Sequence, residues 1–96
     1  MVYFMIKSFK HRGLKRLYER DDKRGIRQDL VETVDDILAR LDSATTAQGL
    51  DLPGYRLHPL KGDLRGYWSV TVRANWRIIF RFEGEDAFDV ELTDYH

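Results

Sequence analysis

The sequence predicts a single α+β domain, with two helices near the N-terminus packed on one face of a small antiparallel β-sheet. Its 96 residues, 43% of them hydrophobic, suffice for one folded core. Apolar residues recur at helical spacing up to about residue 42 and alternate with polar residues from about residue 55. Helices followed by a run of strands are typical of an α+β domain. No linker or internal repeat interrupts residues 1–96, which we therefore expect to form one domain.

The N-terminal half of the chain contains one predicted strand and two predicted helices. Residues 3–9, YFMIKSF, are mostly apolar and are expected to form the first strand. Residues 11–19 are expected to form a short helix, because apolar residues recur every three to four positions with Lys and Arg on the outer side. Residues 28–42 give the clearest predicted helix, with an apolar stripe made of Leu30, Val31, Val34, Ile37, Leu38 and Leu41.

The C-terminal half contains four predicted strands after a loop over residues 43–54, which a Pro-Gly pair marks. The strands are expected over residues 55–60, 67–73, 76–82 and 87–95. Short turns connect them, with KGDLRG after the first, Ala74-Asn75 after the second and EGED after the third. We expect Asn75 to supply the left-handed backbone of its turn, because Asn tolerates that conformation.

The alternation within these strands predicts which side chains face the helices. Those expected to face the helices are Trp68, Val70, Val72, Ile78, Phe80, Phe88, Val90 and Leu92. Those expected to share the uncovered face are Thr71, Arg73, Arg77 and Arg81. Three arginines on one face suit an anion-binding surface, but they equally suit a solvated face on which each arginine pairs with an acid.

The formal net charge of zero conceals four blocks of alternating sign. Residues 7–27 carry nine Lys or Arg against three Asp or Glu, a net charge of +6. Residues 56–81 carry six against one, a net charge of +5, and the blocks 29–51 and 82–96 carry −5 and −6. The basic blocks either bind a nucleic-acid phosphate backbone or pair with the acidic blocks on the protein surface.

Composition and motifs argue against several classes of protein. The chain has no cysteine, and therefore no disulfide framework or thiolate metal site, which suits a cytoplasmic protein. No apolar run is long enough to span a bilayer, and the N-terminus lacks the features of a signal peptide. There is no phosphate-binding glycine loop, HExxH motif or nucleophile elbow. We therefore expect no metal site, no cofactor and no membrane partner.

A set of six residues in the C-terminal half suits RNA cleavage: His58, Lys61, Arg77, Asp94, Tyr95 and His96. Attack by the RNA's own 2′-hydroxyl needs a base, an acid and cations around the phosphate, but no metal. Histidine can act as base or acid near neutral pH, and the Lys and Arg side chains supply positive charge. Each residue also has an ordinary surface role. Asp94 and His96 share a strand side with core residues, so the last strand would have to extend past the helices or contain a bulge.

Three segments of the chain resemble the HigB toxins of HigB–HigA toxin–antitoxin systems, in the RelE/ParE superfamily. They are MIKSFKHRGLKRLYE at residues 5–19, YRLHPLKGDLRGYWSVTVRANWRIIF at residues 55–80 and the terminal DYH. The resemblance begins at Met5, the usual start in that family, and leaves the native start open between Met1 and Met5. It implies a curved antiparallel sheet with two helices near the N-terminus. It also implies a ribosome-dependent endonuclease that cuts mRNA in the ribosomal A site.

The resemblance implies roles for individual residues. The positions that match family catalytic residues are His58, Asp94, Tyr95 and His96. Lys61 and Arg77 match basic residues that bind or stabilise the scissile phosphate, and Arg73 is expected to bind RNA beside them. Asn75 matches a position implicated in reading a base of the A-site codon. We expect the C-terminal residues to be ordered by the last strand and to face His58 across an RNA-sized cleft.

The resemblance also implies partners and leaves rival functions. The partners are a HigA-like helix-turn-helix antitoxin, the ribosome with its 30S A site and rRNA, mRNA, and operator DNA reached through the antitoxin. ParE-type relatives share the fold but poison DNA gyrase without being nucleases, so the fold alone cannot decide. The acid–base set of His58, Asp94 and His96 favours the nuclease. A third alternative is a degenerate member that only binds an antitoxin and DNA.

Overall fold

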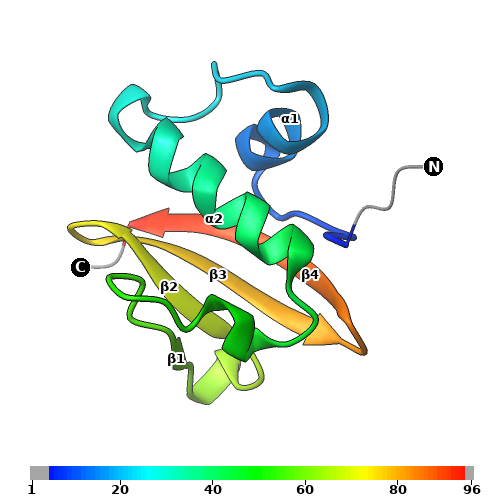
Figure 1. Ribbon diagram of the computed structural model, residues 1–96. Helices are drawn as coiled ribbons and strands as arrows, with labels where there is room; N and C mark the ends of the chain where they lie inside the picture. The colour runs from blue at the N-terminus through cyan, green and yellow to red at the C-terminus, as the bar shows by residue number, and fades with distance from the viewer. Residues whose placement is uncertain (1–4, 95–96) are drawn as a thin grey trace.

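The structure, a computed structural model that describes residues 5–94, confirms the predicted α+β class (Figure 1). Two helices, α1 (Arg12–Arg20) and α2 (Val31–Ser43), lie on one face of a four-stranded antiparallel sheet. The strands lie in chain order: β1 (His58–Pro59), β2 (Trp68–Arg73), β3 (Trp76–Glu83) and β4 (Asp86–Asp94). Short 3-10 turns are η1 (Gln28–Leu30), η2 (Ala47–Leu50) and η3 (Gly62–Leu64). We call the side of the sheet under the helices the helix face, and the other side the open face.

Helix α2 supplies the largest apolar contribution of any helix to the core and crosses the sheet in Figure 1. Its buried stripe, with the preceding turn η1, consists of Leu30, Val34, Ile37, Leu38 and Leu41. It packs on buried side chains of the sheet, which include Val70, Val72, Ile78 and Phe80. The period of two assigned these four strand residues to the helix face, and that assignment is confirmed. The helix expected over residues 28–42 is also confirmed, except that its first turn is a 3-10 turn.

Helix α1 has a polar cap at each end, and it confirms the helix expected over residues 11–19. At its start the Nδ1 atom of His11 accepts a hydrogen bond from the backbone N–H of Leu14, at 3.1 Å. At its end Asp21 adopts a left-handed backbone with φ 53°, and its N–H donates to the carbonyl of Leu17. Leu14 and Leu17 are buried, so this short helix is fixed to the core by one side.

The N-terminal segment pairs with the sheet, but it does so in parallel and only at isolated bridges. Ile6 pairs with Ala87 and Phe9 with Val90, and the Lys7 N–H donates to the Ala87 carbonyl at 2.8 Å. The strand expected over residues 3–9 is therefore wrong for the described part, which begins at residue 5. The segment nevertheless covers the outer edge of β4, which would otherwise offer unpaired backbone groups.

The strand expected over residues 55–60 is reduced to the two residues of β1. Arg56 adopts a left-handed backbone with φ 52°, which interrupts the extended conformation before His58. Pro59 has no N–H to donate, which confines this strand to a sheet edge. Tyr55 still accepts a hydrogen bond from the Thr71 N–H, so the segment remains beside β2.

The β2–β3 hairpin contains a register shift that the period of two did not predict. Thr71 pairs with Arg77 and Arg73 pairs with Trp76, so one extra residue lies in β2 between the two pairs. Arg73 therefore lies beside Trp76, which packs against the core, and it does not share the open face as expected. The left-handed residue of the turn is Ala74, with φ 50°, and not Asn75.

A second bulge lies in β4, at Asp89, which has a left-handed backbone with φ 55°. The partners of β4 shift here, because Arg81 pairs with Phe88 while Ile79 pairs with Glu91. The bulge lets Ala87, Val90 and Leu92 all reach the core, although the first two are three positions apart. Phe88, which was expected to face the helices, instead lies on the open face under the guanidinium of Arg81.

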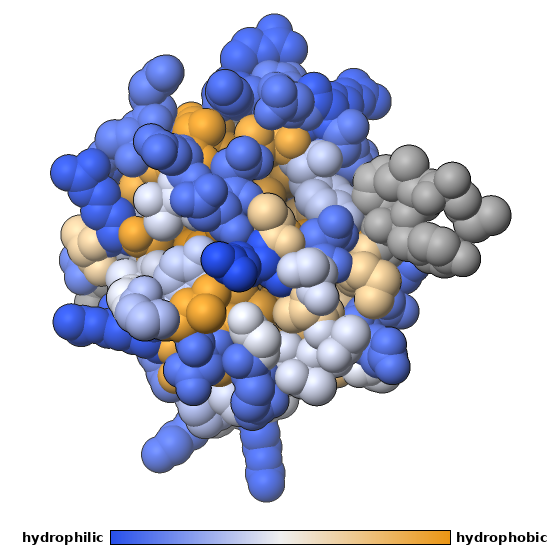
Figure 2. All heavy atoms as spheres, in the orientation of Figure 1, coloured by the Kyte–Doolittle hydropathy of each residue, from blue (hydrophilic) through white to orange (hydrophobic). Residues whose placement is uncertain are grey.

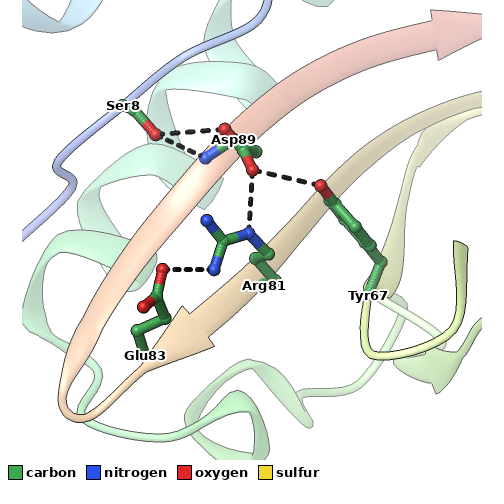
Figure 3. Close-up of polar contacts among 5 residues, drawn as sticks. All are labelled: Ser8, Tyr67, Arg81, Glu83 and Asp89. Carbon is green, nitrogen blue, oxygen red and sulfur yellow. Dashed lines mark hydrogen bonds and ion pairs between the residues drawn. The ribbon is translucent and has the colours of Figure 1, made fainter.

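The Asp89 side chain joins three separate segments on the open face (Figure 3). Its carboxylate accepts hydrogen bonds from Arg81 Nε at 2.8 Å, the Tyr67 hydroxyl at 3.1 Å and the Ser8 hydroxyl at 3.3 Å. Its own backbone N–H donates to the Ser8 hydroxyl at 2.8 Å. The hydrogen bond from Arg81 lowers the pKa of Asp89, so the carboxylate is charged at neutral pH. The cluster fixes the bulge and attaches the N-terminal segment to it.

The surface is dominated by hydrophilic side chains. In the view of Figure 2 hydrophilic side chains cover the upper part of the molecule and its rim, and hydrophobic atoms show mainly in the gaps between them. Among residues 5–94 there is no helix with the length and apolar character needed to cross a membrane.

The cap of α1 makes stability depend on pH. Burial lowers the pKa of His11 below its ordinary 6.5, against the opposing charge of Glu91, so the folded state favours the neutral acceptor. The unfolded state binds the proton more readily, so this contribution is present above about pH 6.5 and is lost as the pH falls. We expect urea unfolding to show a larger loss of stability from pH 7.5 to 5.5 in the wild type than in His11→Asn. Equal losses in both proteins would contradict the neutral cap.

The bulge at Asp89 predicts how substitutions of this residue change the stability of the protein. We expect Asp89→Gly to lower the free energy of unfolding by about 1–2 kcal/mol, because hydrogen bonds to a partly exposed carboxylate are lost. Asp89→Ala should cost about 1 kcal/mol more, because its Cβ is disfavoured in the left-handed region. Urea unfolding of the three proteins measures both differences. Equal stability of the Gly and Ala variants would contradict a left-handed backbone at this position.

Candidate active site

The strand register sorts the predicted site residues into rows across the sheet. Residues that pair across neighbouring strands point to the same face, and successive rows point to opposite faces. One open-face row contains His58, Ser69, Ile79 and Glu91. The next open-face row contains Thr71, Arg77 and Thr93. A helix-face row at the end of the sheet contains Arg73, Trp76 and Asp94. The predicted residues are therefore divided between the two faces.

His58 is exposed on edge strand β1, and its hydrogen bond determines its tautomer. Its Nδ1 atom lies 3.1 Å from the carbonyl oxygen of Arg56. A carbonyl oxygen only accepts, so Nδ1 must carry the proton and donate it. In the neutral ring the lone pair is then on Nε2, which is the atom able to take up a proton. The left-handed backbone of Arg56, two residues earlier, belongs to the bend that brings its carbonyl to the ring.

Arg77 shares the open face with His58, in the neighbouring row. Its Nη1 atom donates to the carbonyl of Ala74 at 2.9 Å and to that of Trp76 at 3.4 Å. These bonds fold the side chain over the β2–β3 turn and fix the direction of the guanidinium. A fixed, permanently charged group on the same face as an exposed histidine suits a phosphate.

Arg81 and Arg73 have carboxylate partners, so for them the alternative of paired arginines is correct. Arg81 lies on the open face but bonds to both Asp89 and Glu83, and these bonds raise its pKa (Figure 3). Arg73 lies on the other face, with Nη1 3.5 Å from Asp29. The predicted surface of three open-face arginines is therefore wrong. Arg77 differs from the other two arginines, because its described side-chain hydrogen bonds go to backbone carbonyl groups.

Asp94 is exposed at the end of β4, beside Trp76 on the helix face. Its strand and that of His58 are the two edge strands of the sheet, three strand spacings or roughly 14 Å apart. The two side chains also point to opposite faces, so the described residues do not form the cleft expected between His58 and the C-terminus. Tyr95 and His96, the other predicted catalytic residues, lie outside the described residues.

Lys61 and Asn75 lie at loops next to the strands that carry the other residues. Lys61 is exposed at the start of η3, two residues after β1. Asn75 is exposed at the tip of the β2–β3 turn, between Arg73 and Arg77. Both side chains are accessible to a large partner, and their RNA-binding roles stay predictions.

Sequence reasoning missed the residues that hold the predicted ones. The Arg56 carbonyl sets the tautomer of His58, and a left-handed arginine leaves no signal in a sequence. Arg27 and Asp29 form a bidentate pair in the α1–α2 loop, at 2.6 and 2.7 Å, and contact the row of Arg73, Trp76 and Asp94. The only sequence signal for them was the basic block at residues 7–27 meeting the acidic block.

The described residues contain no group of three or more His, Asp and Glu side chains placed to hold a metal ion. The predicted site residues that the structure describes include the imidazole of His58, the guanidinium of Arg77 and the carboxylate of Asp94. Their ordinary roles are proton transfer and the binding of anions.

Comparison with known proteins identifies the family. A family model described as the RelE-like toxin HigB of type II toxin–antitoxin systems matches residues 7–96. The chain is 51% identical over 92 residues to the endoribonuclease HigB of Proteus vulgaris, covering 96% of this chain and 100% of that protein. It is 34% identical over 96 residues to toxin HigB-1 of Vibrio cholerae, covering 95% and 98%. The name of the first relative agrees with the predicted endoribonuclease class.

Two solved structures share the fold. A YoeB dimer from Staphylococcus aureus superposes with a TM-score of 0.59 at 17% identity, covering 96% of this chain and 98% of that one. A YoeB/ParE toxin from Agrobacterium tumefaciens gives 0.52 at 22% identity, covering 95% and 99%. These likenesses confirm the predicted RelE/ParE-like fold. The match to the family model over nearly the whole length, with the two HigB relatives, shows that the chain belongs to the HigB-like family of RelE-like toxins of type II toxin–antitoxin systems.

Proposed function

We propose that this HigB-like toxin is an endoribonuclease that cleaves messenger RNA in the ribosomal A site and thereby stops translation. Membership of the toxin family and 51% identity to a protein named an endoribonuclease support the enzyme class. The observation that carries the proposal is the geometry of His58, whose Nε2 is left as the proton acceptor on the face that also presents Arg77. A gyrase poison would have no need for such a group.

The proposed reaction needs only proton transfers and electrostatic stabilisation. The 2′-hydroxyl loses its proton, its oxygen bonds to the adjacent phosphorus, and the bond from phosphorus to the 5′-oxygen breaks. The 5′-oxygen takes up a proton, which leaves a 2′,3′-cyclic phosphate and a 5′-hydroxyl. The two proton transfers are assigned to the set of His58, Asp94 and His96, in which His58 acts through Nε2. Tyr95 orients the nucleotide. Negative charge accumulates on the phosphate during attack, so fixed cations favour the transition state.

The cations are contributed from three places around the end of the sheet. Arg77 acts from the open face and Arg73 from the helix face, while Lys61 acts from the loop after β1. Asn75 lies at the hairpin tip between the two arginines, where its amide reads a base of the codon. Because Arg77 and Asp94 lie on opposite faces, the RNA strand passes around this end of the sheet rather than across one face.

The basic side of α1 is proposed to dock on ribosomal RNA. A shallow hollow of about 320 Å³ on this helix is lined by Arg12, Lys15, Arg16, Glu19 and Arg20. The four cations are exposed and outnumber the single acid. Contacts of this kind neutralise phosphates and release counterions, so they are strongly dependent on salt.

The family implies an antitoxin partner, and we propose that this partner is a HigA-like helix-turn-helix protein. Through it the toxin reaches operator DNA. The ribosomal target places the action of the toxin in the cytoplasm. The gyrase alternative is less well supported, because the two HigB relatives match over nearly the full chain, whereas the likeness to a YoeB/ParE toxin concerns the fold alone.

A translation reaction with purified components tests the proposed cleavage. Mapping of mRNA 5′-ends should show new ends within A-site codons, and only when ribosomes are present. We expect His58→Gln to slow this cleavage at least about 100-fold, because a general acid or base is lost. Arg77→Gln should slow it by a similar factor of about 100, because a charge facing the phosphate is lost. Cleavage by the Asp94→Asn and His96→Ala variants should also be slower than cleavage by the wild type.

Arg40→Gln is the matched control, because Arg40 is an exposed arginine on α2 and is not one of the proposed site residues. It should cleave like the wild type. If the wild type makes no cuts on ribosomes, the proposed function is wrong. Inhibition of DNA gyrase supercoiling by the same preparation would then establish the alternative.

Docking through α1 is tested separately from chemistry. We expect Arg12→Glu with Lys15→Glu to raise the half-saturating ribosome concentration about ten-fold or more at 0.1 M salt, because repulsion replaces two phosphate contacts. The maximal cleavage rate should change little, since neither residue is assigned a role in the chemical step. The control is Arg40→Glu. A fall in maximal rate with unchanged half-saturation would show that α1 does not act by docking.

A further inference from the structure

The α1–α2 loop lies over the end of the sheet that carries Asp94. Arg27, at the end of this loop, places its guanidinium over the ring of Trp76, 5.8 Å from the ring centre. Trp76 is half-buried against the core and lies between Arg73 and Asp94 in the helix-face row. A residue of the loop therefore stands over a row that contains two of the proposed site residues.

Arg27 is held in this position by contacts on several sides. Its Nε and Nη2 atoms donate to the two carboxylate oxygens of Asp29, at 2.6 and 2.7 Å, in a bidentate pair. Asp29 also contacts Arg73 in the row below. Earlier in the loop, Gly25 approaches Gly13 of α1 so closely that a Cβ on Gly25 would lie 2.7 Å from the Gly13 Cα. The loop is thus packed on α1 while Arg27 is fixed to the hairpin.

The position of Arg27 brings its charge to Asp94. Side chains of directly paired residues on one face have Cβ atoms about 5 Å apart, so the Asp94 carboxylate starts beside the Trp76 ring. The hydrogen bonds to Asp29, and the charge of Asp94 in addition, raise the pKa of Arg27. Two ion pairs link the loop to the row that contains Asp94, because Asp29 bonds both to Arg27 and to Arg73.

We propose that Arg27 is a positioning residue for Asp94, holding the carboxylate at the end of the helix-face row where the cleavage reaction uses it. This inference rests on the proposed function, because Asp94 is assigned there to proton transfer. An aspartate side chain can rotate between several rotamers. A guanidinium fixed by Asp29 and Trp76 restricts that rotation. Arg27 itself does not touch the RNA in this proposal.

Ribosome-dependent cleavage of mRNA tests the proposal through its two kinetic constants. Arg27→Gln should lower the maximal rate about ten-fold and leave the half-saturating ribosome concentration unchanged, because positioning acts on the chemical step. Arg27→Lys keeps the charge but loses the bidentate pair, so it should restore part of the rate. Arg24→Gln is the matched control, since Arg24 forms a similar ion pair with Asp22 in the same loop, and none of its hydrogen bonds within residues 5–94 goes to a proposed site residue.

A double variant shows whether Arg27 acts through Asp94. In the Asp94→Asn background, Arg27→Gln should have no further effect, because the carboxylate that it positions is gone. Independent, multiplied losses would overturn the proposal. So would a raised half-saturating concentration with an unchanged maximal rate, which would make Arg27 an RNA contact. An Arg27→Gln variant as fast as Arg24→Gln would overturn it too.

A measurement without ribosomes separates this inference from the proposed function. The side-chain carboxyl carbon of Asp94 is observable by NMR in the full chain. Its resonance should move in Arg27→Gln and stay in place in Arg24→Gln, with both variants as stable as the wild type, since exposed ion pairs contribute little to stability. An unmoved resonance in Arg27→Gln would refute the proposed positioning of Asp94 by Arg27, whether or not the toxin cleaves RNA. A moved resonance in a protein that makes no cuts would refute only the function.

Discussion

The bulge at Asp89 is the constraint on which the rest of the sheet depends. Without the extra residue, Ala87 and Val90 would point to opposite faces, and one of them would leave the core. The cost of a left-handed aspartate is offset by its bonds to Ser8, Tyr67 and Arg81. Because every position after the bulge changes face, Asp89 also determines that Asp94 stands beside Trp76 on the helix face rather than on the open face with Arg77.

The fold class could be predicted because it depends on average periodicity, whereas the faces of individual residues depend on single irregularities. The apolar stripe of α2 and the alternation of Val70, Val72, Ile78 and Phe80 each extend over several turns or pairs, so they predict burial well. Phe88 and Arg73 were assigned to the wrong faces because a bulge adds one residue, and one residue reverses a period of two. Bulges here use Asp and Val rather than glycine, which leaves no compositional mark.

The candidate site was predicted in its residue types but not in its arrangement. Histidine, arginine and aspartate suit RNA cleavage by their chemistry alone, and the resemblance to a toxin family selected among them. The contacts that hold these residues in place could not be predicted. The Arg56 carbonyl reaches His58 through a local bend, and Arg27 reaches Trp76 because the loop packs on α1. The chemical type of a side chain can be read from a sequence, whereas a local backbone bend and a contact between distant segments cannot.

The parallel pairing of the N-terminal segment with β4 has a consequence for the toxin during its own synthesis. Ser8 bonds to a residue 81 positions later, so the segment finds its partner only after the chain has been translated through β4. Until then the earlier elements lack both their outer strand and the bulge that places the core residues of β4. A nascent chain therefore cannot complete this fold until β4 has left the ribosome. The topology delays the appearance of a folded domain until all of the described segments, from the N-terminal one to β4, have been made.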